Sequence, residues 1–190
     1  MSTELPTPES LRELGESSTN VATAWAGAED FLTQGMVVWT RRALADDQKV
    51  AVRAAAAACK LVIDRYPTDS AETQAPKQYL DDLLAKMTRW IDNASNTNRE
   101  AVRSSLDVTR QLHAWQGYAD QAHFWTLEAV DHASLAVWAG ERSSYIMPLD
   151  YATTAARAVT CVLHALIVGG ASEAEAVQQL GTVVLAAQAA

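Results

Sequence analysis

The chain has 190 residues, 49% of them hydrophobic and 20% charged, which is typical of a soluble globular protein with a single domain. Acidic residues outnumber basic residues 23 to 15, so the net charge at pH 7 is −8. This balance argues against a nucleic-acid-binding protein, because binding to a phosphate backbone depends on Lys and Arg. It favours a basic protein partner, which opposite charge would attract more rapidly.

Cysteine usage and hydropathy indicate a cytoplasmic protein. Cys59 and Cys161 lie in apolar runs without a second cysteine nearby, so we expect small buried hydrophobic residues rather than a metal site or a disulfide framework. Residues 1–10 lack the basic and apolar regions of a signal peptide. No apolar run approaches the ~20 residues of a membrane span. We therefore expect no cofactor and no membrane association.

The N-terminal part of the chain predicts a loose arm followed by short helices. Residues 1–8 contain two prolines and polar side chains, as in a flexible arm, and the domain is expected to cover residues 9–190. A short helix is predicted at about residues 9–14. The apolar segment 20–40 contains Gly27 and Gly35, so we expect a broken helix or a pair of helices there.

A third helical segment is rich in alanine. Asp46 or Asp47 can cap its N-terminus, and Pro67 ends it. Residues 54–58 are five consecutive alanines, which favour helix and add almost no side-chain bulk. This segment predicts a helix that a neighbouring helix can approach closely.

Residues 76–92 give the clearest amphipathic pattern in the chain. Pro76 suits the first turn of a helix. Apolar side chains follow at helical spacing, at Leu80, Leu83, Leu84, Met87, Trp90 and Ile91. Asp81 and Asp82 lie opposite this stripe and form a candidate acidic surface for a partner, although a solvated face explains them equally simply.

The second half of the chain continues the helical pattern to the C-terminus. Asn98 can cap the next helix, and Ser172 with Glu175 forms the capping-box pattern of the last one. Between these two starts we expect three helices, at about residues 99–115, 118–139 and 150–168. No strand-like alternation occurs. The sequence predicts an all-α protein, an antiparallel bundle of six to eight helices.

The helix expected at residues 118–139 is apolar on most sides and carries one coherent polar group, Glu128, Asp131 and His132. These residues are three and four positions apart, so their side chains are neighbours on a helix. A metal site needs more ligands than one helix supplies here. Acid–base catalysis could use the histidine beside a carboxylate. The third interpretation is a structural clasp, in which His132 hydrogen-bonds Glu128 or a carboxylate from a neighbouring helix.

The remaining histidines and the tryptophans are more typical of a core than of a site. His113 and His164 lie on apolar faces, where histidine usually bonds a backbone carbonyl. His123 and His132 project to different sides of their helix and cannot share a metal. Most of the six tryptophans should anchor the core, with one or two at an interface; they are Trp25, Trp39, Trp90, Trp115, Trp125 and Trp138.

The order of these features resembles the Imm-5-like immunity proteins that accompany polymorphic toxins in bacteria. An alanine-rich helix ends in YPTD at residues 66–69, similar to a turn of that family, and a helix with Trp90 follows. The sequences DHA at residues 131–133 and AVWA at residues 136–139 resemble the family's histidine-containing helix, although Glu128 stands where a further histidine is expected. The resemblance implies a protein that neutralises a cognate toxin by binding, without catalysis.

Three functional hypotheses follow from these patterns. The first is a non-enzymatic helical binding protein, an immunity protein whose partner is a toxin. The second is a scaffolding subunit that forms a helical homo-oligomer. The third is a helical enzyme that uses Glu128, Asp131 and His132.

Overall fold

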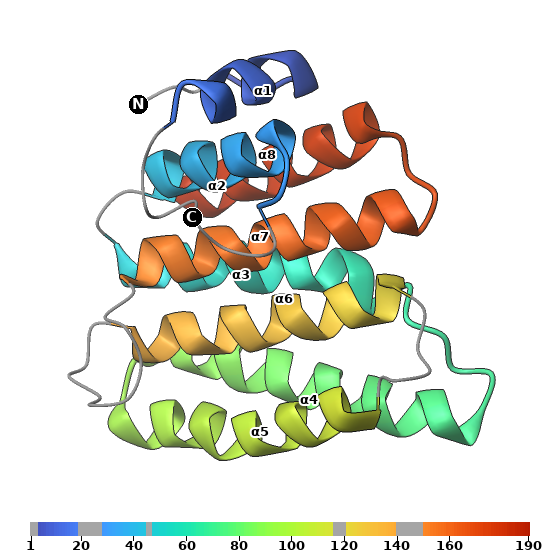
Figure 1. Ribbon diagram of the computed structural model, residues 1–190. Coiled ribbons are helices and arrows are strands. Elements are labelled where there is room, and N and C mark those ends of the chain that lie inside the picture. The colour runs from blue at the N-terminus through green and yellow to red at the C-terminus, as the bar shows by residue number, and fades with distance from the viewer. Residues whose placement is uncertain (1–3, 19–27, 45–46, 116–120, 140–149) are drawn as a thin grey trace.

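The computed structural model describes residues 4–18, 28–44, 47–115, 121–139 and 150–190, with the backbone alone at residues 71–72, 106–115 and 121 (Figure 1). These residues form helices and no strand, which confirms the predicted all-α fold. The described helices are α1 (Pro8–Glu16), α2 (Phe31–Leu44), α3 (Gln48–Ile63), α4 (Ala71–Asp92), α5 (Asn96–Trp115), α6 (Gln121–Trp138), α7 (Tyr151–Val168) and α8 (Glu173–Ala189).

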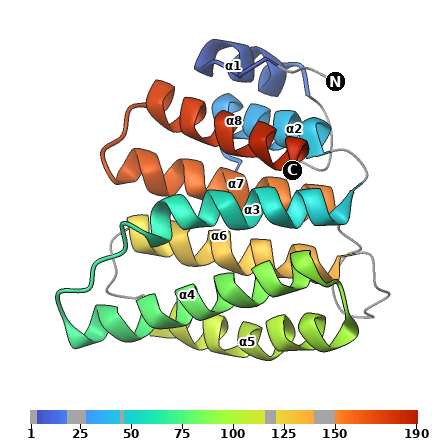
Figure 2. The same cartoon turned by 180° about the vertical axis from the view of Figure 1, so that it is seen from behind.

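The helices stack as layers across the molecule. Figures 1 and 2 show α1 at one end, then α2 with α8, then α7 with α3, then α6, and finally α4 with α5 at the other end. Helices that follow one another from α2 onward run in opposite directions (Figure 1). The centre of the stack is formed by α3, α6 and α7, which pack against one another.

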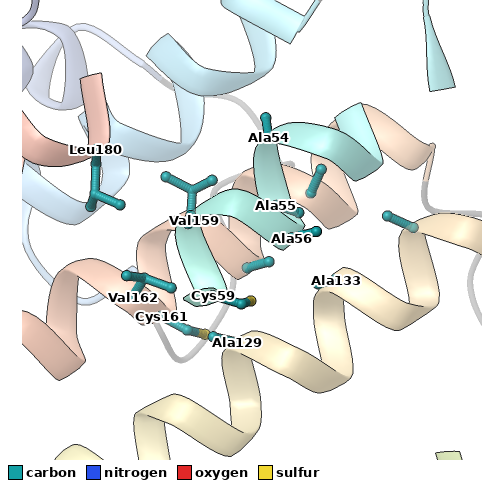
Figure 3. Close-up of a cluster of buried hydrophobic side chains, with 14 of the residues drawn as sticks. Ala54, Ala55, Ala56, Cys59, Ala129, Ala133, Val159, Cys161, Val162 and Leu180 are labelled. Carbon is teal, nitrogen blue, oxygen red and sulfur yellow. The ribbon is translucent and has the colours of Figure 1, made fainter. Parts of the chain in front are cut away.

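This centre is built from small side chains. The run of alanines lies in α3, which packs against α6 and α7, and Figure 3 shows Ala55 and Ala56 near Cys59, Cys161 and the alanines of α6. Ten alanines of α3, α6 and α7 are fully buried, namely Ala51, Ala54, Ala55, Ala58, Ala129, Ala133, Ala136, Ala155, Ala156 and Ala158. Small side chains let helix backbones approach closely, so the predicted close packing at this run is confirmed.

Helix α4 packs through the predicted apolar stripe but begins earlier than expected. Leu80, Leu83, Met87 and Trp90 are buried, while Leu84 and Ile91 are partly buried at its edge. The helix starts at Ala71, after a capping box between Ser70 and Thr73, so the prediction of a first-turn Pro76 is wrong. A proline there removes only one bond near the start of a long helix, and the capping box offsets that loss.

Gly35 does not interrupt a helix as predicted; it lies inside α2. A Cβ on Gly35 would overlap the backbone of Leu11, and one on Gly15 would overlap the backbone of Phe31. Each glycine therefore gives the backbone of the other helix room at the crossing of α1 and α2. Gly27 lies outside the described residues.

The helix ends follow the predicted caps, with one exception. Asp47 caps α3, and Ser172 and Glu175 form the capping box of α8. Asn98 does not cap the helix that follows it. Its side-chain amide donates to the carbonyls of Arg89 and Asn93 and so caps the end of α4, whereas the Ser95 hydroxyl accepts the Asn98 N–H at the start of α5.

Residues 4–8 lie within the predicted arm. Pro6 is buried, and its Cδ would be 2.7 Å from a Cβ at Gly181 of α8. Thr7 caps α1, which starts at Pro8. Residues 1–3 lie outside the described part of the chain, so a flexible arm over the whole of residues 1–8 stays a prediction.

Helix α7 is the candidate for a membrane span among the described residues, by length and hydropathy alone. Within the bundle 72% of it is buried. It contacts α6, α3, α2 and α8, which is the environment of a core helix in a soluble protein. The tryptophans whose side chains are described are likewise core residues, because Trp90 is buried and Trp39, Trp125 and Trp138 pack against the core.

Candidate functional site

The polar group of α6 lies on one of the three central helices of the bundle. Helix α6 packs against α7, α3, α5 and α4. His132 Nε2 and Glu128 Oε2 are 3.9 Å apart, with 11% and 28% of their side chains exposed. This distance suits an ion pair with a protonated imidazole and exceeds a hydrogen bond, so the predicted hydrogen bond between these two residues is not formed in this geometry.

The carboxylates of this group lie close to α7. Burial raises the pKa of the Cys161 thiol well above its ordinary value, and the negative charges of Glu128 and Asp131 raise it further. Burial also raises the pKa of Cys59. A buried, protonated thiol is a poor nucleophile, so both cysteines are core residues, as the sequence predicts.

Two features of the described residues bear on metal binding and catalysis. No group of three or more His, Cys, Asp or Glu side chains is placed to hold a metal ion among the described residues. The side chain of His132 exposes only 11% of its surface, which leaves a substrate little access to the imidazole. The structure brings Glu128 and His132 together on one turn of α6, in agreement with the helical spacing.

The other histidines take part in ring contacts. The imidazole of His164 stacks on Trp125, with ring centroids 4.2 Å apart and an angle of 20° between the planes. The imidazole of His123 lies 4.7 Å from the ring of Tyr66. Both rings are partly buried rather than enclosed in the core. The side chain of His113 lies outside the described residues.

A pocket of about 170 Å³ lies where α3 and α7 end and α6 begins. Its lining comes from three parts of the chain: Val62, Arg65 and Tyr66; Ala122, His123 and Thr126; and Ala165, Leu166 and Gly169. Sequence reasoning missed this site. No motif marks it, because each helix end contributes a few residues and only the packing of the three helices places them together.

Asp81 and Asp82, the candidate acidic surface, are exposed but engaged in ion pairs. Asp81 lies 2.6 Å from Lys77, and Asp82 lies 2.6 Å from Lys86, each pair separated by one helical turn. Half of each aspartate side chain is exposed, so a partner could reach them. The lysines nevertheless neutralise much of the charge that would attract a basic partner.

No family model matches the chain, and neither curated proteins nor solved structures give a similar protein.

Proposed function

We propose that the protein is a cytoplasmic, non-enzymatic binding protein whose partner is a basic protein. The resemblance to Imm-5-like proteins suggests that this partner is a toxin, which the protein neutralises by direct binding. The enclosed position of His132 and the protonated, buried cysteines favour binding over catalysis.

The observation that carries the proposal is an acidic surface at the end of the bundle formed by α1 and α2. We call it the α1–α2 surface; it consists of Glu13, Glu16, Glu29, Asp30 and Phe31. All five are exposed. Gly15 lies against the backbone of Phe31, which places the end of α1 over the start of α2.

The charges of the α1–α2 surface are available to a partner. Its four carboxylates form no ion pair with a described residue, in contrast to Asp81 and Asp82. Phe31 exposes 50% of its surface among them. An exposed aromatic side chain on a surface whose carboxylates form no ion pair with a described residue suits a basic partner, because charge speeds the encounter and the ring gives an apolar anchor.

The test begins with the genes beside the gene for this protein, among which the proposal expects a toxin gene. We expect that producing this protein restores the growth of cells that make the toxin, and that the two purified proteins form a complex whose association slows with added salt. Glu13→Gln/Glu16→Gln should slow association severalfold. Asp81→Asn/Asp82→Asn removes the same number of charges from the paired surface and should leave the rate nearly unchanged.

Three outcomes would contradict the proposal. The first is a gene neighbourhood without a toxin, and the second is a neighbouring toxin that forms no complex with this protein. The third is an association rate that is indifferent to ionic strength, which would overturn capture by charge even if a complex forms.

A further inference from the structure

The pocket at the ends of α3, α6 and α7 is a second candidate site, which the proposed protein-binding surface does not account for. These three helix ends lie together on one side of the molecule (Figures 1 and 2). The described lining of the pocket shares no residue with the α1–α2 surface. This lining combines one cationic side chain, two aromatic rings, a hydroxyl and an apolar floor.

The cationic side chain is Arg65. Its guanidinium donates to the neutral side-chain oxygen of Gln179 at 3.2 Å and forms no ion pair with a described carboxylate. The adjacent Asp64 is held by Lys60, at 2.9 Å. No Asp or Glu is among the described residues that line the pocket. In a protein with a net charge of −8, Arg65 is thus the formally charged residue in the described lining of the pocket.

The backbone carbonyls at the ends of α3 and α7 are already hydrogen-bonded. Val62 accepts from the Arg65 N–H, Ala165 from the Gly169 N–H, and Leu166 from the Ala171 N–H. These bonds reduce the negative partial charge that two helix C-termini present to the pocket. The guanidinium remains the formal charge available to a ligand, and arginine pairs well with carboxylates.

The size and the remaining lining define the body of the ligand. Val62, Ala165 and Leu166 supply apolar surface, and the rings of Tyr66 and His123 lie 4.7 Å apart at an angle of 42°. The volume of about 170 Å³ is close to that of an engineered apolar cavity, roughly 150 Å³, that takes up benzene. We propose that this pocket binds a small aromatic monocarboxylate, with its carboxylate on Arg65 and its ring between the apolar floor and the aromatic pair.

Benzoate is the probe that tests this proposal on the full chain. In an NMR titration of the ¹⁵N-labelled protein, we expect saturable shifts at the amides of the pocket, with a roughly millimolar Kd as befits so small a ligand. Arg65→Gln should weaken binding by roughly tenfold to a hundredfold, since a charge-assisted hydrogen bond is lost. Arg42→Gln removes an exposed arginine from α2 and should leave the Kd unchanged.

Further probes separate charge from shape. Benzamide keeps the ring but lacks the charge, and inorganic phosphate keeps a charge but lacks the ring; both should bind at least tenfold more weakly than benzoate. Ala122→Leu fills the pocket and should abolish binding while Arg65 remains. Amide spectra of each variant show whether the fold is retained.

Either of two results would overturn the inference. One is the absence of pocket shifts at benzoate concentrations that saturate a millimolar site. The other is benzoate binding that survives both Arg65→Gln and Ala122→Leu in folded proteins, since binding would then lie elsewhere. The benzoate experiment does not test toxin binding. If benzoate does not bind, this inference is wrong, but the proposed function still stands.

Discussion

The centre of the bundle and the outer helix α4 both bury apolar residues, but many of the buried side chains in the centre are small, whereas those on α4 are large. In the centre, α3, α6 and α7 contribute many buried alanines and two buried cysteines beside larger apolar residues. On α4, the buried residues are all large, namely Leu80, Leu83, Met87 and Trp90. The comparison teaches that one core can be sensitive to added volume in one region and to lost volume in another.

The largest expected effect is on the α4 side. Leu83 is completely buried, so Leu83→Ala removes apolar contacts and leaves a cavity. We expect the free energy of unfolding to fall by about 2–5 kcal/mol, measured by urea denaturation. Leu84→Ala is the matched control one residue further along. Because Leu84 is only partly buried, its loss should cost less, and equal costs would show that burial does not control the difference.

The second prediction reverses the substitution in the centre. Ala55 is completely buried where α3 faces its neighbours, so Ala55→Leu forces bulk into a close helix contact. We expect a loss of about 1–3 kcal/mol in the free energy of unfolding. Ala85→Leu makes the same change at an exposed position of α4 and should be nearly neutral. A stable Ala55→Leu variant would mean that the centre can open and would remove the contrast between the regions.

The two regions also differ in how well the sequence predicts them. The apolar spacing of α4 is local, so its buried face is predicted residue by residue. The start of α4 is not predicted correctly. Local propensity favours a start at Pro76, whereas the observed helix begins after the Ser70–Thr73 capping box. Gly35 was expected to break a helix, and only the nearby backbone of Leu11 explains why a glycine belongs inside α2.

The candidate sites show the same limit more strongly. Helical spacing within one segment predicts that the side chains of Glu128 and His132 are neighbours. The pocket around Arg65 joins three segments whose contact depends on the whole fold, and no pattern within any one of them indicates it. Asn98 is a similar case at small scale, because its amide reaches back to the preceding helix rather than forward.

The third prediction concerns Asp150, the cap of the central helix α7. Its carboxylate accepts from the Thr153 N–H at 2.7 Å and from the Thr153 hydroxyl at 2.9 Å. Asp150→Ala should lower the free energy of unfolding by about 1 kcal/mol, the usual loss for an N-cap. Asp150→Asn keeps an acceptor at this position and should cost less.

The pH dependence of this cap has a definite sign. Burial opposes the charge of Asp150, but the hydrogen bonds from Thr153 and the positive charge of Arg41 outweigh it and lower the pKa of the carboxyl. A lowered folded-state pKa stabilises the fold above the ordinary value of 3.8, and this contribution is lost as the pH falls through the folded-state value. The difference between wild type and Asp150→Asn should therefore shrink in acid, measured by urea denaturation from pH 6 downward; a difference that grows would contradict the assignment.

The fourth prediction asks whether the polar group of the centre is a clasp. Glu128 and His132 are 3.9 Å apart in a partly buried setting, so their contributions should depend on each other. Thermal and urea unfolding of Glu128→Ala, His132→Ala and the double variant should give a coupling of about 0.5 kcal/mol or more. Strictly additive effects on stability, combined with loss of partner binding, would instead make this pair part of a functional surface.

The smallest effect is expected where the α4 side meets solvent. Asp82 pairs with Lys86 at 2.6 Å, and Lys86 also donates to the Ser105 hydroxyl at 2.9 Å. Asp82→Asn should lower the free energy of unfolding by about 0.3–0.5 kcal/mol, because half of the aspartate is in water, where ion pairs are weak. The effect should shrink in about 1 M salt, where the screening length is only roughly 3 Å. Asp81→Asn removes the equivalent ion pair with Lys77 and should lower the free energy of unfolding by a similarly small amount. A loss above 1 kcal/mol at Asp82 alone would show that the link from Lys86 to Ser105 in α5 depends on that carboxylate, and that this face stabilises the contact between α4 and α5.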